Sequence, residues 1–156
     1  MADPITIVQV VSASASLAMQ CVRVAKALHD LAGKYKTAEV NILSLANEVD
    51  IIRLAWERIE SVLQLWEESD AADDGLLAEL RLKLGFGNLV VSTLANDIDS
   101  FTKRPFSFLQ RTKYVWDEET FRGHQDRIRG QVAAMNLLVS VLNLYVPLHI
   151  FISTMR

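Results

Sequence analysis

One stretch of the chain carries an uninterrupted heptad pattern, and this pattern limits the fold more than any other feature of the sequence. Between residues 38 and 67, apolar side chains recur at alternating spacings of three and four: Ile42, Leu45, Val49, Ile52, Trp56, Ile59, Leu63 and Trp66. Such a repeat places these side chains on one side of an α-helix and favours shallow packing against other helices. Other apolar residues widen the stripe: Leu43, Ile51, Leu54, Val62 and Leu65. We therefore expect a central helix over 38–67 that contacts neighbours on two sides.

Three further segments repeat this spacing, over 3–33, 76–101 and 117–145. In the first, Asp3 is a suitable cap, Pro4 suits the first helical position and Gly33 is the residue expected just past the end. No stretch alternates with the period of two that a half-buried strand requires. The fold class predicted is all-α, a four-helix bundle with long heptad-patterned helices.

The end of the chain is strongly apolar after Pro147, which is expected to break the fourth helix. Residues 148–155 then form a short tail with room for a fifth helix. At 156 residues the chain is one domain's worth, 1–156. Because so apolar a terminus is unusual, we expect this domain to be the N-terminal part of a larger protein.

Composition narrows the function classes. The formal net charge is −3, which argues against nucleic acid as a partner, because phosphate binding needs a basic face. Cys21 is the only cysteine, so no disulfide can form within the chain and a reducing compartment is expected. Half of the residues are hydrophobic and the mean hydropathy is +0.19, high for a soluble protein of this size. More apolar surface is therefore present than one small core easily hides.

The first helix has two plausible environments, a protein core and a membrane. No charged residue occurs between Ile5 and Val22, and a helix of that length spans about 27 Å, close to the ~30 Å of a bilayer core. Polar residues interrupt this segment: Thr6, Gln9, Ser12, Ser14, Ser16 and Gln20. Charged residues follow the apolar part instead of preceding it, so a signal peptide is not indicated and the chain should stay in the cytosol.

Two local features were considered for chemistry and interpreted as structural. The carboxylates between Glu67 and Asp74 precede Gly75 without the offsets of a calcium loop, so they predict an acidic turn that caps the next helix. Gly85 and Gly87 fall inside the third helix, where each costs on the order of 1 kcal/mol relative to alanine. They indicate either a close approach by a neighbouring helix or a kink.

The segment over 102–116 interleaves basic and aromatic residues. One interpretation is a contact with an anionic lipid surface or a single-stranded nucleic acid; the other is a loop pinned to its own core with its charges in water. The candidate anionic-lipid contacts are Lys103, Arg104, Arg111 and Lys113.

Catalytic patterns are lacking. His29, His124 and His149 lie far apart, and none has a second ligand at a metal-binding spacing. The adjacent glutamates 67/68 and 118/119 point to different sides of a helix, so they cannot form one acid–base pair. We expect no enzyme activity, no metal and no cofactor.

Three segments together resemble the fungal HeLo-like N-terminal domain: MADPITIVQVVSASASLAMQCVRVAKALHDLAGKYKTA, NILSLANEVDIIRLAWERIESVL and FSFLQRTKYVWDEETFRGHQDRIRGQVAAMNLLVSVL. Such domains are similar to the membrane-permeabilising helical bundle of mammalian necroptosis, and they commonly head fungal immune receptors with an NTPase and repeats behind them. The resemblance implies a cell-death effector of fungal innate immunity that moves from the cytoplasm to plasma-membrane lipids, forms a homo-oligomer and inserts its first helix.

The resemblance also implies the residues of the membrane role. The inserting apolar residues would be Ile5, Ile7, Val8, Val10, Val11, Leu17, Met19 and Val22. The polar content of this segment favours insertion as an oligomer with polar faces together. The alternative is a non-enzymatic module that binds proteins by helix–helix contact and signals to downstream receptor domains of the same or a partner chain.

Overall fold

The computed structural model describes residues 4–36, 39–69, 73–103 and 118–154. Nearly all of this part is helical, in four long elements: α1 (Pro4–Lys34), α2 (Glu39–Ser69), α3 (Asp74–Lys103) and α5 (Glu118–Thr154). The described ranges contain no strand. The predicted all-α four-helix bundle is therefore confirmed, and each helix begins and ends within two residues of its predicted position, except at the end of α5.

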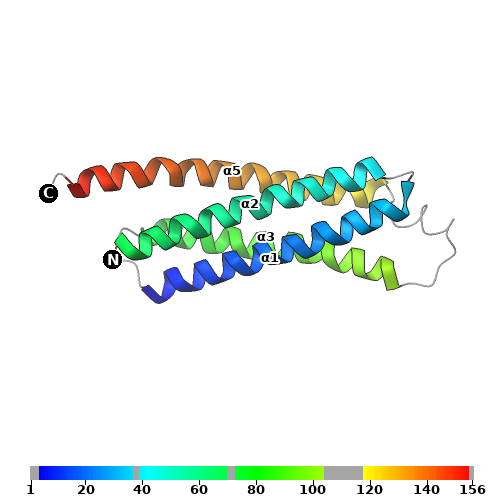
Figure 1. Cartoon of the computed structure of the whole chain (residues 1–156), viewed down its shortest axis with the longest axis horizontal. Coiled ribbons are helices and arrows are strands. Elements are labelled where there is room, and N and C mark those ends of the chain that lie inside the picture. The colour runs from blue at the N-terminus through cyan, green and yellow to red at the C-terminus, as the bar shows by residue number, and fades with distance from the viewer. Residues whose placement is uncertain (1–3, 37–38, 70–72, 104–117, 155–156) are drawn as a thin grey trace.

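The helices form a four-sided bundle in which neighbours are not simply consecutive in sequence. α1 and α3 lie side by side and run in the same direction, and α2 and α5 run the opposite way (Figure 1). The contact between α1 and α2 is by far the most extensive, followed by α2 with α5 and α1 with α3. The contact between α3 and α5 is the smallest of the four sides.

Small side chains explain the close contact of α1 with α2. Ala18, Ala25 and Ala32 recur every seventh residue of α1 and are buried, and Ala46 is buried on α2. Because the separation of two helices is set by the side chains between them, alanines let the backbones approach. The α1–α2 hairpin is thus the best-packed half of the molecule.

The heptad stripe of α2 lies in the core as predicted, and all eight of its residues are buried. Trp56 has no exposed surface and Trp66 forms a tilted ring pair with Tyr145 of α5, with 5.7 Å between the ring centroids. Two of the residues that widen the stripe differ, because Leu54 and Leu65 face solvent. α2 has neighbours on two sides, α1 and α5, but neither of them covers these two leucines.

The start of α3 follows the predicted acidic cap. The backbone N–H of Leu76 donates to Oδ1 of Asp73 at 2.9 Å, which satisfies one of the free donors of the first turn. Further along α3 the two glycines differ. A Cβ at Gly87 would lie 3.1 Å from Cδ2 of Leu17, whereas Gly85 has nothing within 4 Å. Gly87 therefore serves a close approach of α3 to α1.

The predicted break at Pro147 is wrong. α5 continues as one helix to Thr154, so the apolar tail over 148–154 is part of α5 and not a separate fifth helix. A proline removes only its own N–H hydrogen bond and crowds one preceding carbonyl, a local cost that a long helix can absorb. This last part of α5 extends beyond the end of the bundle at which α1 begins (Figure 1).

Candidate functional site

Among the described residues, α1 is the one helix long and apolar enough to cross a membrane, by length and composition. The segment runs over Thr6–Lys34, its most apolar window has a mean hydropathy of 1.4, and 39% of that window is buried in the bundle. A buried core helix can pass the same test. The exposed part of α1 is therefore the informative part.

The predicted insertion residues divide between two faces of α1. Ile7, Val10 and Leu17 are buried against the other helices. Val8, Met19 and Val22 are exposed, with 43–55% of each residue accessible, and Val11 is half-buried. The side chain of Ile5 lies outside the described residues.

The outer face of α1 carries exposed apolar side chains and is uncharged as far as Val22, with the exposed Ser12 and Ser16 beside them. Val8, Ala15, Met19 and Val22 follow one another at spacings of seven, four and three, which places them along one side of the helix. The first charges that follow are Arg23, four residues after Met19, and Lys26. α1 is thus apolar on both its core face and part of its solvent face, an arrangement that a helix serving only as a core element does not need.

The polar residues of α1 have structural partners within the bundle. Gln9 Oε1 accepts a hydrogen bond from Arg81 Nη2 at 2.7 Å, and Gln20 Nε2 donates to Ser92 Oγ at 3.0 Å. Both bonds join α1 to α3. The buried Ser14 donates to the carbonyl of Val10 within α1 at 2.8 Å. These three polar side chains are therefore satisfied internally, whereas Ser12 and Ser16 are exposed on the outer face.

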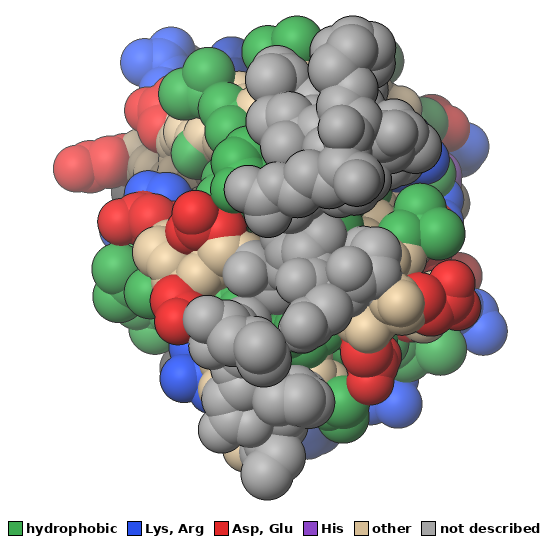
Figure 2. Space-filling view, turned by 90° about the vertical axis from the view of Figure 1, so that its left-hand side faces the viewer, with side chains coloured by type: hydrophobic (Ala, Val, Ile, Leu, Met, Phe, Trp, Pro, Cys, Tyr) green, Lys and Arg blue, Asp and Glu red, His purple; other side chains and the backbone are tan. Residues whose placement is uncertain are grey.

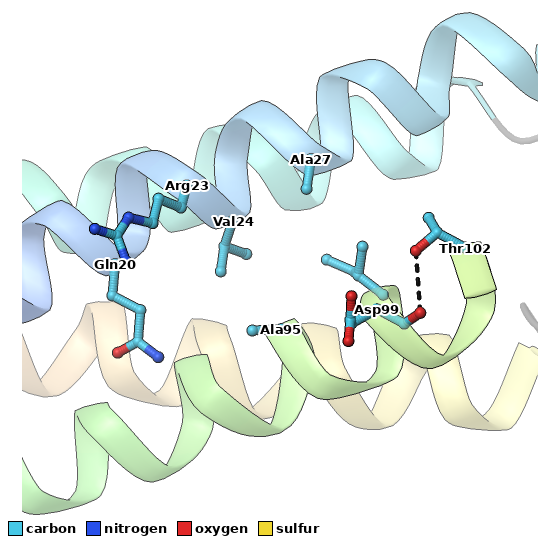
Figure 3. A pocket seen from close by; sticks show the side chains of 8 residues that line it. Gln20, Arg23, Val24, Ala27, Ala95, Asp99 and Thr102 are labelled. Carbon is cyan, nitrogen blue, oxygen red and sulfur yellow. Dashed lines mark hydrogen bonds between the residues drawn. The ribbon is translucent and has the colours of Figure 1, made fainter.

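Two open grooves lie between α1 and α3. The first has a volume of about 340 Å³, and its lining is apolar in the middle with polar groups at its rim: Gln20, Arg23, Val24, Ala27, Ala95, Ile98, Asp99 and Thr102. Figure 3 shows Arg23 turned along α1 and the Asp99 carboxylate turned toward the space between the helices. The second, about 470 Å³, lies where α1 and α3 begin. Neither gathers a nucleophile with a base.

The predicted lipid-contact residues are only partly placed. Lys103 is exposed in the last turn of α3, and its Nζ pairs with Asp99 Oδ2 at 2.5 Å. Arg104, Arg111 and Lys113 lie outside the described residues. Whether the four cations form one patch stays a prediction.

The titratable groups of the described part do not assemble a reactive centre. His124 is buried, with its Nε2 2.7 Å from Asp97 Oδ2, whereas His29 is exposed and the side chain of His149 is not described. Burial raises the pKa of Cys21 to about 12, and the nearby Asp50 charge adds to the increase. The thiol is therefore protonated and inert near neutral pH. Within the described ranges, no three His, Cys, Asp or Glu side chains are placed to hold a metal ion.

Exposed apolar residues on α3 and α5 were missed by the sequence reasoning, which followed only the core stripe of each helix. Six large apolar side chains face solvent there: Leu82, Phe86, Leu89, Leu137, Val141 and Leu144. Their spacings of four and three repeat the helical period, so a search for a second stripe on each helix would have found them.

Seen from the end at which α1 begins, acidic and basic side chains surround the face and apolar side chains reach the surface between them (Figure 2).

Comparison of the chain with protein-family models, curated proteins and solved structures gives no match. What the domain does is therefore argued from its own geometry.

Proposed function

We propose that this domain is a non-enzymatic, membrane-acting effector of the HeLo-like kind, whose first helix enters the plasma membrane after the domain oligomerises. The observation that carries the proposal is the uncharged outer face of α1, with Val8, Met19 and Val22 exposed on a helix of membrane-spanning length. Contiguous apolar surface on a soluble protein marks contact with a membrane or another protein. A lipid surface would cover this face without any change in the fold.

Full insertion requires more than surface contact. Val10 and Leu17 face the core, so the bilayer gains them only if α1 exchanges contacts in the bundle for lipid or for other copies of the helix. Gln9 and Gln20 would then lose their partners on α3, whereas Ser14 keeps its bond to the Val10 carbonyl within α1. Because polar side chains in hydrocarbon need hydrogen-bond partners, insertion as an oligomer that pairs these residues is favoured.

The remaining parts of the proposal follow from this role. The resting domain is cytoplasmic and relocates to the plasma membrane on activation, where Lys103 and the three undescribed cations Arg104, Arg111 and Lys113 contact anionic lipid headgroups. An NTPase and repeats, on the same or a partner chain, would supply the trigger.

A matched pair of exposed substitutions tests the proposal. Met19 and Leu54 are 55% and 54% exposed, on the outer faces of α1 and α2, so Met19→Lys and Leu54→Lys should leave the bundle equally folded. Met19 is near the middle of Thr6–Lys34, where a lysine raises the cost of insertion by about 2.5–3.5 kcal/mol. We expect Met19→Lys to lose leakage of dye from anionic liposomes by roughly a hundredfold, and Leu54→Lys to behave as wild type.

Circular dichroism and urea midpoints establish that both variants are folded. Equal leakage from the two lysine variants and the wild type would contradict insertion of α1. An inert wild type, even when joined to a domain that forces oligomerisation, would contradict the membrane role altogether.

A second candidate is a helical protein-interaction module of a fungal receptor that never contacts lipid. The exposed apolar rows on α3 and α5 favour it, because they are on helices other than α1 and would suit a helical partner. A fusion of residues 1–156 to a fluorescent protein separates the two. Diffuse signal and healthy cells at strong expression support the interaction module, whereas signal at the cell periphery and cell death support the membrane role.

A further inference from the structure

The contact between α3 and α5, here called the α3–α5 seam, is the least extensive side of the bundle. Its residues are Gly87 and Asp97 on α3 and His124 and Gln131 on α5, joined by two pairs. His124 Nε2 lies 2.7 Å from Asp97 Oδ2, and Gln131 Nε2 lies 2.9 Å from the position a Cβ would take at Gly87. Val90, three residues after Gly87 and seven before Asp97, is on the same side of α3 and is buried.

The interior of this seam contains buried polar groups beside Val90. His124 and Gln131 are two of the three buried polar residues in the described part of the chain. Gln131 Nε2 donates to the carbonyl of Lys83 at 3.4 Å, longer than the usual 2.7–3.2 Å. Beneath it, the buried Nε1 of Trp56 has no hydrogen-bond partner and lies 3.7 Å from the Cβ position of Gly87. Buried polar groups with poor partners weaken the closed arrangement.

The exterior of the same two helices is apolar. Leu82, Phe86 and Leu89 on α3 are exposed, and so are Leu137 and Val141 on α5. Helical spacing places each row along one side of its helix, and Leu82 also lines the groove between α1 and α3. The seam therefore buries polar groups beside Val90 and leaves large apolar side chains on the outer surface of the same helices, which holds the two helices less firmly than a wholly apolar contact would.

The other three sides of the bundle have more extensive contacts. α1 packs on α2 through buried small residues, and α1 is tied to α3 by the bonds Gln9–Arg81 and Gln20–Ser92. The remaining side, α2 with α5, combines the ion pair of Glu48 with Arg129 at 2.9 Å with the ring contact of Trp66 and Tyr145. Each outer helix is thus attached to one helix of the α1–α2 hairpin and only weakly to the other outer helix.

We propose that the bundle opens along the α3–α5 seam, so that α3 and α5 separate. The α1–α2 contact acts as the hinge: α3 stays packed on α1, and α5 stays packed on α2. Opening uncovers the inner face of the hairpin, including Leu17 and Trp56, while α1 and α2 stay paired. In the membrane-acting role, on which this consequence rests, the opening gives lipid or a second copy access to the buried face of α1 before that helix leaves α2.

Thiol labelling in the absence of a membrane tests the opening. The native Cys21 serves as the reference, because it reports on the α1–α2 contact and not on the seam. Cys21 is buried between α1 and α2, near Asp50 and Arg53, and stays covered in the proposed open form. A single thiol at Val90→Cys, in a Cys21→Ala background, becomes accessible when the seam opens. We expect dithionitrobenzoate to label Val90→Cys at least tenfold faster than Cys21 in the wild type, after each rate is divided by the rate of the same thiol in the unfolded chain.

A matched pair of substitutions assigns the opening to this seam. Gln131→Leu replaces the buried amide of the seam with an apolar side chain and should slow labelling of Val90→Cys at least tenfold. Gln20→Leu makes the same exchange on the α1–α3 side and should leave the rate unchanged. Equal labelling of Val90→Cys and Cys21, at the rate of global unfolding, would overturn the proposal, and so would equal slowing by Gln131→Leu and Gln20→Leu.

Leu94→Cys, one turn further along α3 and also buried, is a second reporter if Val90→Cys does not fold. Fast labelling together with absent liposome leakage would keep the seam and reject the membrane role. Liposome leakage together with labelling of Val90→Cys only at the rate of global unfolding would keep the membrane role and reject opening of the seam.

Discussion

Alanine substitutions at the two neighbouring glycines of α3 should change stability in different directions. Both positions are inside the helix, where alanine is favoured over glycine by about 0.8–1.0 kcal/mol. A Cβ at Gly85 has nothing within 4 Å. We therefore expect Gly85→Ala to raise the free energy of unfolding by the full propensity difference, about 1 kcal/mol.

At Gly87 the same methyl group meets the core. It would lie 3.1 Å from Cδ2 of Leu17 and 2.9 Å from Nε2 of Gln131. The amide can turn away only by losing its bond to the carbonyl of Lys83, and Leu17 is buried with little room to move. Overpacking of this kind costs about 1–3 kcal/mol, so after the propensity gain Gly87→Ala should lower the free energy of unfolding by about 0–2 kcal/mol.

Urea denaturation followed by far-ultraviolet circular dichroism measures both variants, and similar slopes against urea allow the free energies to be compared. The double variant Gly87→Ala with Leu17→Ala tests the contact itself, because it should be more stable than the sum of the single effects. If Gly87→Ala stabilises the domain as much as Gly85→Ala does, α3 does not approach α1 at this point.

Two further predictions concern the core. Trp56→Ala should lower the free energy of unfolding by about 3–5 kcal/mol, since Trp56 is fully buried, and a loss below about 1 kcal/mol in urea denaturation would place the ring outside the core. Burial raises the pKa of Cys21 from 9.0 to about 12, so between these values the thiol ionises in the unfolded chain but not in the folded one. The contribution of Cys21 to the free energy of unfolding is therefore fully present below pH 9. It is lost as the pH rises from there toward 12, by up to about 1.4 kcal/mol per pH unit. The wild type should therefore lose stability across this range relative to Cys21→Ala, and parallel pH profiles of the two proteins would contradict the burial of the thiol.

The number and length of the helices could be predicted because heptad spacing is a local property of the sequence. Trp56 and Leu63 recur with the period of a helix, and that period places them in a core whatever the neighbours are. The end of α5 could not be predicted from Pro147. One proline destabilises a helix locally, but the helical residues on both sides of it can offset that cost. Spacing also does not say which helices are neighbours, so the parallel placement of α1 beside α3 comes only from the structure.

The candidate site was predictable in outline only. The absence of charge between Ile5 and Val22 identified α1, but that criterion alone left Met19 and Leu17 in one class. The structure separates them, since Leu17 is in the core and Met19 is in solvent. The two glycines of α3 looked alike for the same reason, because close approach depends on a helix far away in the sequence.

The parallel arrangement of α1 beside α3 makes each end of the bundle electrically uneven. Aligned peptide dipoles place roughly half a positive charge at a helix start and half a negative charge at its end, so two starts lie together on one side and oppose the ends on the other. Where α1 and α3 end, Lys34 and Lys103 offset the negative side, and Glu39 offsets the start of α2. Where they begin, Asp74 offsets α3, but the first turn of α1, Pro4–Ile7, has no acidic residue. Asp3, the expected cap just before this turn, is therefore the carboxylate of the sequence that is able to offset the start of α1.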